Sequence, residues 1–273
     1  MRELGGFRGN QLFQVAATVG IARAIGARPC LPPRWSYRPY LNVPDEWFRP
    51  ARGRHMEAWA WEGLDYMDER ARLYLQDPAL FRDVADEIRA AFDLSARGEV
   101  LVYDAAERER YAYLNAPDSA IAMHVRRGDL LTQEQGYQPA LTMEAPAYYR
   151  DALRVLDPHG ARDVFVFSDD ADWCELELPR RVHRYVTVMR TAPPRSHIPA
   201  QYRRQAPLDL IDLHLFGRAN NLILSNSTFA WWGAWLAGFT DHVLYPSLWF
   251  GPKLDYIDTD LLFVDLPWRQ VPC

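Results

Sequence analysis

Residues 121–130 constrain the fold more than any other stretch of this chain, and they read I-A-M-H-V-R-R-G-D-L. The apolar run 121–125 has the length of a buried parallel strand, and charged side chains follow it at once. Open α/β folds bind ligands at the carboxyl edge of such a sheet, so the segment predicts a strand that delivers polar groups to a site. Gly128 is expected to let the backbone turn sharply after the arginines.

The two adjacent arginines of this segment, Arg126 and Arg127, point in opposite directions in an extended chain, because successive side chains alternate faces. One can serve a ligand while the other ties the turn to its surroundings. Arg126 shares its face with His124, and a planar guanidinium beside an imidazole suits a nucleoside diphosphate. Asp129 would orient or neutralise one arginine, or act as a base. A purely structural ion pair at a strand end is the alternative interpretation.

Two more predicted strands, at 164–167 and 222–224, also run into polar side chains. Because the carboxyl ends of parallel strands share one edge of a sheet, we expect these clusters to meet the arginines. The second cluster precedes a predicted helix over 229–237, whose first N–H groups can hold phosphate oxygens. Each cluster alone is also consistent with a helix cap, but together they predict a nucleotide-diphosphate pocket. The clusters are Ser168, Asp169 and Asp170, and Ser225, Asn226, Ser227 and Thr228.

The acidic cluster has two interpretations. In the first, Asp169 caps the helix that follows and Asp170 binds guanine or ribose. In the second, Asp170 and Asp172 hold a divalent cation, which commonly neutralises a sugar diphosphate. We expect no metal, because Arg126 and the hydroxyl-rich helix start already supply positive potential. The three cysteines are too scattered for a zinc site or a disulfide framework.

The second half of the chain alternates strands and helices, which predicts a doubly wound α/β sheet. Further helices are expected at 145–156 and 208–218, and further strands at 182–188 and 243–245. The best domain boundary is the loop at 115–118, just before the central strand.

The first half opens with a glycine-rich turn over residues 5–11, which leads into a predicted helix over 11–25. Gly26 is the expected stop of that helix. Asn10 would lie at the helix N-terminus, where N–H groups favour an anion, and an ordinary capping asparagine is the alternative.

A short strand is expected after this helix, at 28–31. An irregular aromatic region over 35–66 follows, and its rings are expected to pack rather than to form a platform for a sugar. Asp77 then caps a helix that begins with Pro78.

Composition excludes several classes of protein. With 273 residues the chain has room for one large domain or two of moderate size. The net charge of −5 argues against a protein that binds nucleic acid, which would need a basic face. No apolar run has the length of a membrane span, and no signal peptide is present, so we expect a cytoplasmic protein or one held peripherally at the inner membrane. The first residues look clipped, and we expect the true start to lie upstream.

Four motifs together resemble those of a known family. They are G-G-F-R-G-N-Q-L-F-Q at 5–14, H-V-R-R-G-D-L at 124–130, F-S-D-D at 167–170 and S-N-S-T-F-A-W-W-G-A-W at 225–235. Over nearly the whole chain, and in this order, they resemble the motifs of bacterial α-1,2-fucosyltransferases of glycosyltransferase family 11. The related α-1,6- and protein O-fucosyltransferases share the arginine motif.

The resemblance implies a GT-B fold, with two Rossmann-like domains facing a cleft. Residues 1–116 would form the N-terminal, acceptor-side α/β domain and residues 117–273 the C-terminal domain that binds GDP-fucose. It implies inverting transfer of L-fucose from GDP-fucose to the 2-hydroxyl of a terminal β-galactoside on an oligosaccharide acceptor. No metal or other cofactor is expected. The alternatives are a transferase that uses another nucleotide sugar and a non-catalytic, carbohydrate-binding relative.

The family also implies roles for individual residues. Arg126 would bind the β-phosphate and stabilise the departing GDP, and His124 would contact the nucleoside. Asn10 would lie across the interdomain cleft, near the diphosphate. Ser227 and Thr228 would hold phosphate or fucose. The predicted donor site is completed by Arg127, Asp169, Asp170, Ser225 and Asn226.

Inversion needs a carboxylate near the acceptor hydroxyl, opposite the leaving diphosphate. Asp129 is the first candidate for this base, and Glu134, which matches the base proposed in the α-1,6 relatives, is the second. The chain departs from the family pattern at two positions. Arg8 is an extra residue in the glycine turn, and Leu130 replaces a usual aromatic residue in the arginine motif.

Overall fold

The computed structural model describes residues 4–49, 58–60, 62–64, 74–109, 117–132, 136–191, 207–238 and 242–273. The chain divides into two compact units: Met1–Val100 with Ile257–Val264, and Leu101–Tyr256 with Asp265–Cys273. Helix α4 (Ala96–Glu109) crosses this division, which falls earlier in the chain than the domain boundary predicted between residues 116 and 117.

Within the described residues, the second unit is built on a sheet of six parallel strands in the order β3-β2-β1-β4-β5-β6. The winding of such a sheet reverses between β1 and β4, and open α/β folds bind ligands at the carboxyl ends of the strands at this point. The predicted α/β class is therefore confirmed. The strands are β1 (Ala120–Val125), β2 (Asp163–Ser168), β3 (Thr187–Val188), β4 (Asn221–Ile223), β5 (Val243–Pro246) and β6 (Arg269–Val271).

The register of the central strands brings their ends to one level. Val125 at the end of β1 pairs with Ser168 at the end of β2, and Met123 pairs with Ile223 of β4. The polar residues that follow these three strands therefore start side by side, as the sequence predicts.

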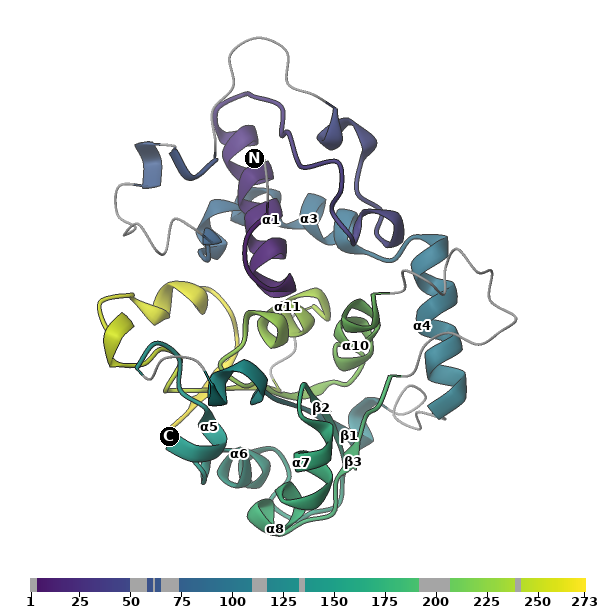
Figure 1. Ribbon diagram of the computed structural model, residues 1–273, viewed down its shortest axis with the longest axis vertical. Helices are drawn as coiled ribbons and strands as arrows, with labels where there is room; N and C mark the ends of the chain where they lie inside the picture. The colour runs from purple at the N-terminus through teal and green to yellow at the C-terminus, as the bar shows by residue number, and fades with distance from the viewer. Residues whose placement is uncertain are drawn as a thin grey trace. The chain divides into compact units, whose positions relative to one another are not determined.

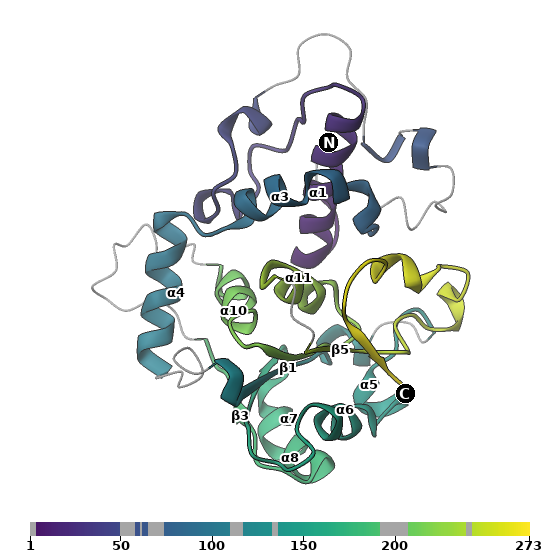
Figure 2. The same cartoon turned by 180° about the vertical axis from the view of Figure 1, so that it is seen from behind.

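Helices cover both faces of this sheet (Figure 1 and Figure 2). In both views α10 and α11 lie on one face, and α6, α7 and α8 lie on the other. Buried residues of α6, α7 and α8 form one core with the all-buried strand β1, and Tyr148, Tyr149 and Leu153 of α6 belong to it. The helices are α5 (Leu141–Glu144), α6 (Tyr148–Leu156), α7 (Ala171–Leu176), α8 (Leu178–Val182), α10 (Leu208–Phe216) and α11 (Thr228–Leu236).

Short helical turns complete the second unit. They are η8 (Pro117–Ser119), η9 (Gly128–Leu131) and η10 (Pro252–Leu254). No helix in the described part of the chain has both the length and the apolar character needed to cross a bilayer.

The first unit is built around α1 (Arg8–Ala24). This helix ends as predicted at Gly26, whose φ is +64°: its N–H bonds to the Arg23 carbonyl, and the Ala27 N–H bonds to that of Ala22. The other elements are η1 (Arg38–Tyr40), η2 (Asp45–Phe48), η3 (Ala58–Ala60), η4 (Glu62–Leu64), η5 (Pro78–Leu80), η6 (Arg82–Val84), α3 (Ala85–Phe92) and η11 (Thr259–Leu262).

One predicted strand is wrong, and a second is much shorter than predicted. Residues 28–31 form no strand, because no described neighbour pairs with them in a sheet. In place of a strand over 182–188, α8 runs to Val182, His183 takes a left-handed conformation with φ 54°, and β3 holds two residues.

Four rings in the described part of the aromatic region at 35–66 are packed, as expected, whereas residues 50–57, 61, 65 and 66 and the side chain of Trp59 lie outside the description. Trp35, Tyr37, Tyr40 and Trp47 are each at most 5% exposed. The helix predicted from Asp77 is also present, but it is divided into η5, η6 and α3, and the Asp77 carboxylate accepts a hydrogen bond from the Ala79 N–H at 2.8 Å.

Candidate functional site

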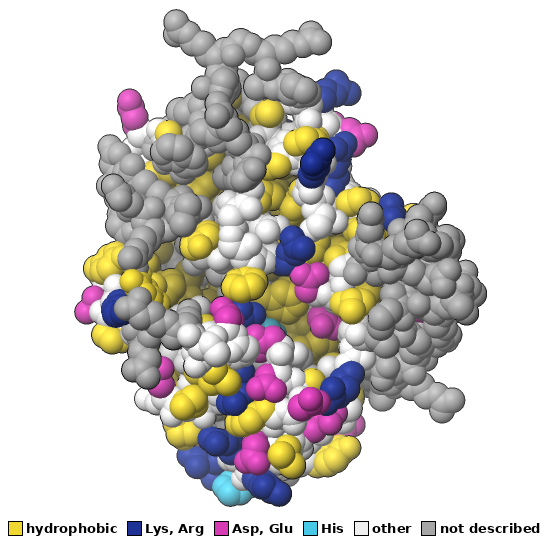
Figure 3. Space-filling view, in the orientation of Figure 1, with side chains coloured by type: hydrophobic (Ala, Val, Ile, Leu, Met, Phe, Trp, Pro, Cys, Tyr) yellow, Lys and Arg dark blue, Asp and Glu magenta, His cyan; other side chains and the backbone are white. Residues whose placement is uncertain are grey.

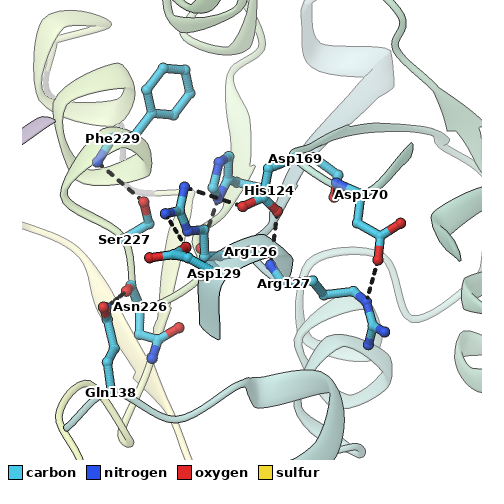
Figure 4. A network of polar contacts seen from close by, with 12 residues as sticks. His124, Arg126, Arg127, Asp129, Gln138, Asp169, Asp170, Asn226, Ser227 and Phe229 are labelled. Atoms are coloured by element: carbon cyan, nitrogen blue, oxygen red, sulfur yellow. Dashed lines mark hydrogen bonds and ion pairs between the residues drawn. The ribbon is translucent and has the colours of Figure 1, made fainter. Parts of the chain in front are cut away.

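The three polar clusters of the second unit meet at the carboxyl edge of the sheet, around the ends of β1, β2 and β4 (Figure 4). His124 Nδ1 lies 2.7 Å from Ser225 Oγ, which joins the ends of β1 and β4. Arg126 Nη1 lies 3.2 Å from Asp169 Oδ2, which joins β1 to β2. The convergence predicted from the sequence is therefore present.

The Arg126 guanidinium is fixed between two carboxylates. One is Asp169, and the other is Asp129, which accepts a hydrogen bond from Nη2. The Arg126 side chain is 20% exposed, so it is held in place yet open to solvent. A preorganised cation of this kind can take up negative charge without reorganising.

Arg127 points the opposite way, into the protein. Its Nε donates to Asp170 Oδ2 at 3.0 Å and its Nη1 to Thr142 Oγ1 at 2.7 Å. Its guanidinium carbon lies 3.8 Å from the centre of the Trp173 ring, a cation–π contact. The division of labour between the two arginines is the one that alternation predicts, and Arg127 is the residue that ties the turn to its surroundings.

Gly128 is required for space rather than for a special backbone conformation. Its φ is outside the left-handed region, so the turn itself does not need glycine. A Cβ at this position would lie 2.5 Å from Asp169 Oδ2. The same carboxylate accepts the Arg127 backbone N–H at 2.8 Å and pairs with Arg126. Glycine therefore lets Asp169 approach the turn closely enough to hold both.

The helix cap falls to Asp170, and the prediction that Asp169 caps is wrong. Asp170 Oδ1 accepts the Trp173 N–H at 3.2 Å and so caps α7. Asp172, the other carboxylate of the alternative metal site, is paired with Arg190 at 2.5 Å. Among the described residues, no group of three or more His, Cys, Asp or Glu side chains is arranged to hold a metal ion.

His124 is buried and neutral. Burial, and then the charge of Arg126, lower its pKa to about 3. Its ring packs against Phe229 at 5.3 Å and Phe216 at 6.2 Å between centroids. A neutral imidazole can both donate and accept a hydrogen bond, and the contact of His124 with a nucleoside stays a prediction.

The residues of the turn after β4 either cap or begin helix α11 or are fully buried. Ser227 caps α11, because its Oγ accepts the Phe229 N–H at 3.3 Å, and Thr228 is the first residue of that helix. Ser225 and Asn226 are fully buried. The first turn of α11 is thus the part of this segment that can offer N–H groups to an anion.

The cluster of described residues does not include two of the predicted site residues. Glu134 falls outside the described residues. Asn10 belongs to the first unit, in the first turn of α1, where its Oδ1 accepts a hydrogen bond from Gln76 Nε2 at 3.0 Å. The helix begins at Arg8, so Asn10 is not the N-cap. Arg8 is helical and bonds Gln11 at 3.1 Å, so it does not enlarge the glycine turn.

Several residues that shape the edge were not predicted. Thr142 and Trp173 hold Arg127, Gln138 bonds the turn after β4, and Phe229 packs on His124. Each lies in a segment whose pattern indicates a helix or a loop, and nothing in that pattern points to a distant partner.

The charges on the surface are mixed. Over α7 and α8, at the lower end of Figure 3, basic and acidic side chains are interspersed. This face has none of the single-sign charge that nucleic-acid binding needs, in line with the net charge of the chain.

Comparison with known proteins identifies the family. The family model described as "Glycosyl transferase family 11" matches residues 50–249. The chain belongs to glycosyl transferase family 11. The resemblance inferred from the four motifs is thereby confirmed.

Two relatives of this family-11 chain come from Escherichia coli. The "O-antigen biosynthesis glycosyltransferase WbnK" is 30% identical over 181 residues, which are 65% of this chain and 54% of the relative. An "Alpha-1,2-colitosyltransferase" is 30% identical over 135 residues, 48% of this chain and 41% of the relative. The chain thus matches about half the length of these relatives.

Among solved structures, the "NodZ alpha-1,6-fucosyltransferase soaked with GDP-fucose" resembles the family-11 chain. It is 16% identical, with a TM-score of 0.46, and the comparison covers 86% of this chain and 90% of that one.

Proposed function

We propose that this member of glycosyl transferase family 11 is an inverting fucosyltransferase, which moves L-fucose from GDP-fucose to the 2-hydroxyl of a terminal β-galactoside. The observation that carries the proposal is the position of Arg126. Its guanidinium is held by Asp129 and Asp169 at the point where the winding of the sheet reverses, beside buried, neutral His124.

The chemistry follows from that position. In the transfer, the acceptor oxygen forms a bond to C1 of fucose while the bond from C1 to the β-phosphate oxygen breaks. The electron pair of the broken bond leaves with GDP, and the acceptor proton passes to a carboxylate of the protein. Arg126 and the first N–H groups of α11, next to Ser227, would stabilise the charge that builds on the diphosphate.

Removing the charge of Arg126 tests the proposal. Arg126→Ala is expected to cost on the order of 3 kcal/mol of transition-state stabilisation, roughly a hundredfold in kcat/KM. Arg190→Ala is the matched control, because Arg190 is also held between two carboxylates, Asp172 and Glu175. Turnover of GDP-fucose with a panel of galactosides, with the linkage read by NMR, is the measurement. Near-normal turnover by the Arg126 variant would refute the phosphate role.

The two candidate bases, Asp129 and Glu134, can be distinguished because Asp129 is also bonded to Arg126. Asp129 already accepts a hydrogen bond from Arg126, so Asp129→Asn should weaken GDP binding as well as turnover. If Glu134 is the base, Glu134→Gln should lower kcat by about a hundredfold or more and leave the calorimetric affinity for GDP unchanged. If instead the Asp129 variant loses turnover at unchanged GDP affinity and the Glu134 variant does not, Asp129 is the base.

The proposed reaction uses no metal and no other cofactor, since Arg126 and the α11 N-terminus supply the positive potential. Full turnover in excess EDTA is expected. Turnover that stops in EDTA and returns with a divalent cation would contradict this part of the proposal.

A second candidate differs in the donor. One relative is named an alpha-1,2-colitosyltransferase, which favours a test of nucleotide sugars other than GDP-fucose. Calorimetry with GDP, UDP and dTDP identifies the nucleotide, and turnover with GDP-fucose and GDP-colitose identifies the sugar. Sugar binding that does not depend on GDP, with no release of GDP, would instead indicate a carbohydrate-binding protein.

A further inference from the structure

Three loops of the second unit meet at the fully buried side chain of Asn226. We call this arrangement the edge clasp, and it consists of residues 136–140, 225–227 and 249–253. The first loop follows the turn that bears the arginine motif, the second is the turn between β4 and α11, and the third follows β5.

The Asn226 side chain joins all three loops at once. Its Nδ2 donates to the Pro139 carbonyl at 2.8 Å and to the Trp249 carbonyl at 3.2 Å. In the other direction, Gln138 Nε2 donates to the Asn226 backbone carbonyl (Figure 4). Both donors of the side-chain amide are therefore directed at backbone groups of neighbouring loops, and the residue is 0% exposed.

The outer loops are also paired with each other. The Gly251 N–H donates to the Tyr137 carbonyl at 2.8 Å, and the Lys253 N–H donates to the Gly136 carbonyl at 2.7 Å. A Cβ on Gly251 would lie 2.5 Å from the Gly136 carbonyl oxygen, so the two backbones approach as closely as glycine allows. The clasp is consequently a paired structure in which Asn226 is the link to α11.

We infer that Asn226 is a positioning residue for the proposed transfer and does not itself bind the donor. The inference rests on the proposed function. Ser227, the next residue, caps the helix that would receive the diphosphate, while the loop at 136–140 follows, in the sequence, the turn that carries Asp129. Asn226 thus fixes the leaving-group side of the edge against the loop that follows the arginines. Small displacements between such groups lower the rate of reaction more than they weaken binding.

The chain contains a matched control at the amino end of β4, the strand that precedes the turn with Asn226. Asn221, the first residue of β4, is 3% exposed, and its Nδ2 also donates to two backbone carbonyls. They belong to Ala120 at 3.0 Å and Asp118 at 3.3 Å, at the amino edge of the sheet. Replacing either asparagine by alanine removes the same kind of bond, but one replacement is beside the proposed site and the other is far along the strand from it.

The experiment compares Asn226→Ala with Asn221→Ala at a temperature below the unfolding transition of both. Thermal midpoints should fall by similar amounts. The kcat of the Asn226 variant should be about ten- to a hundredfold below that of the Asn221 variant, while its affinity for GDP by calorimetry stays within about threefold of the unaltered chain. If Asn226→Ala does not fold, Gln138→Ala removes one bond of the same clasp and should lower kcat in the same direction.

A readout that needs no turnover separates the clasp from the proposed function. Amide hydrogen exchange at Gly251 and Lys253 should be faster in the Asn226 variant and unchanged in the Asn221 variant. If exchange behaves in this way but the unaltered chain neither binds GDP nor transfers fucose, the clasp stands and the proposed function fails. Equal kcat in both variants of an active enzyme would overturn the inference, and so would a loss of GDP affinity as large as the loss of kcat, which would make Asn226 a donor ligand.

Discussion

The neighbours Arg126 and Arg127 show how position decides the role of a residue. Both carry the same guanidinium, yet one is 20% exposed at the sheet edge and the other is buried among Asp170, Thr142 and Trp173. Alternation along an extended chain is enough to predict this division. It is not enough to predict the partners, because they come from segments far away in the sequence.

The limit of prediction is clearest at adjacent residues of one type. Asp169 and Asp170 follow the same strand, and each could cap the helix after it. The structure gives the cap to Asp170 and places Asp169 against the arginine turn. The choice depends on the space beside Gly128, which the sequence does not display.

The close approach of Asp169 to Gly128 leads to a prediction. Gly128→Ala should lower the free energy of unfolding by about 1–3 kcal/mol, because the new Cβ would collide with the carboxylate. In an Asp169→Ala background the same change should cost little, because the colliding atoms are gone. Urea unfolding of the two single variants and the double variant gives the coupling. Additive losses would show that the alanine acts through the backbone instead.

At the scale of elements, strong patterns predict well and short ones do not. The strand at 164–167 is a fully apolar run, the strand at 121–125 is apolar except for His124, and both are present and lead into polar clusters. The run at 182–188 has apolar residues too, but α8 takes its first residue and leaves two for β3. Strand β6 and helix α4 were not predicted. Strand β6 has three residues, two of them exposed, and exists because β5 offers a partner.

Strand β1 and helix α10 each bury a titratable group, and the two groups have opposite effects on how stability depends on pH. On β1, burial and then Arg126 lower the pKa of His124 to about 3. Below about pH 6.5 the unfolded chain therefore binds a proton at His124 that the folded chain does not bind. The contribution of His124 to the free energy of unfolding is thus present above that pH and is lost as the pH falls towards 3. On α10, burial raises the pKa of Asp212 to about 7 against the Thr191 hydrogen bond. The contribution of Asp212 to the free energy of unfolding is therefore present below about pH 3.9 and is lost as the pH rises towards 7.

The two contributions nearly cancel between pH 4.5 and 6.5, and single variants should separate them. In His124→Gln the free energy of unfolding should fall with rising pH, and in Asp212→Asn it should rise. Each change should amount to about 1–2 kcal/mol over that interval. Urea unfolding at several pH values is the measurement, with the unaltered chain as the reference. Slopes of the same sign in both variants would contradict the assignment of one of the two groups.

At the scale of the whole molecule, the chain passes between its two units more than once. It leaves the second unit after Tyr256, adds Ile257–Val264 to the first, and returns to form β6. The sequence predicts two domains but not this return, because the pattern of one segment does not reveal which core it joins. The GT-B prediction concerns how the two units face each other, and it stays a prediction.

Each unit has its own core. A destabilising substitution in residues 257–273 should therefore destabilise only the unit to which the substituted residue belongs. Leu262 is 2% exposed on η11, an element that contacts η5 in the first unit, and Leu262→Ala should cost about 2–5 kcal/mol there. Val271, 3% exposed on β6, belongs to the core of the second unit, and Val271→Ala should cost about 1–3 kcal/mol. Hydrogen exchange distinguishes the two: the Phe81 N–H, bonded to Pro78, should lose protection in the first variant, and the Ser247 N–H, bonded to Val271, in the second. Equal loss of protection at both amides in either variant would mean that the units unfold as one cooperative body, in spite of their separate cores.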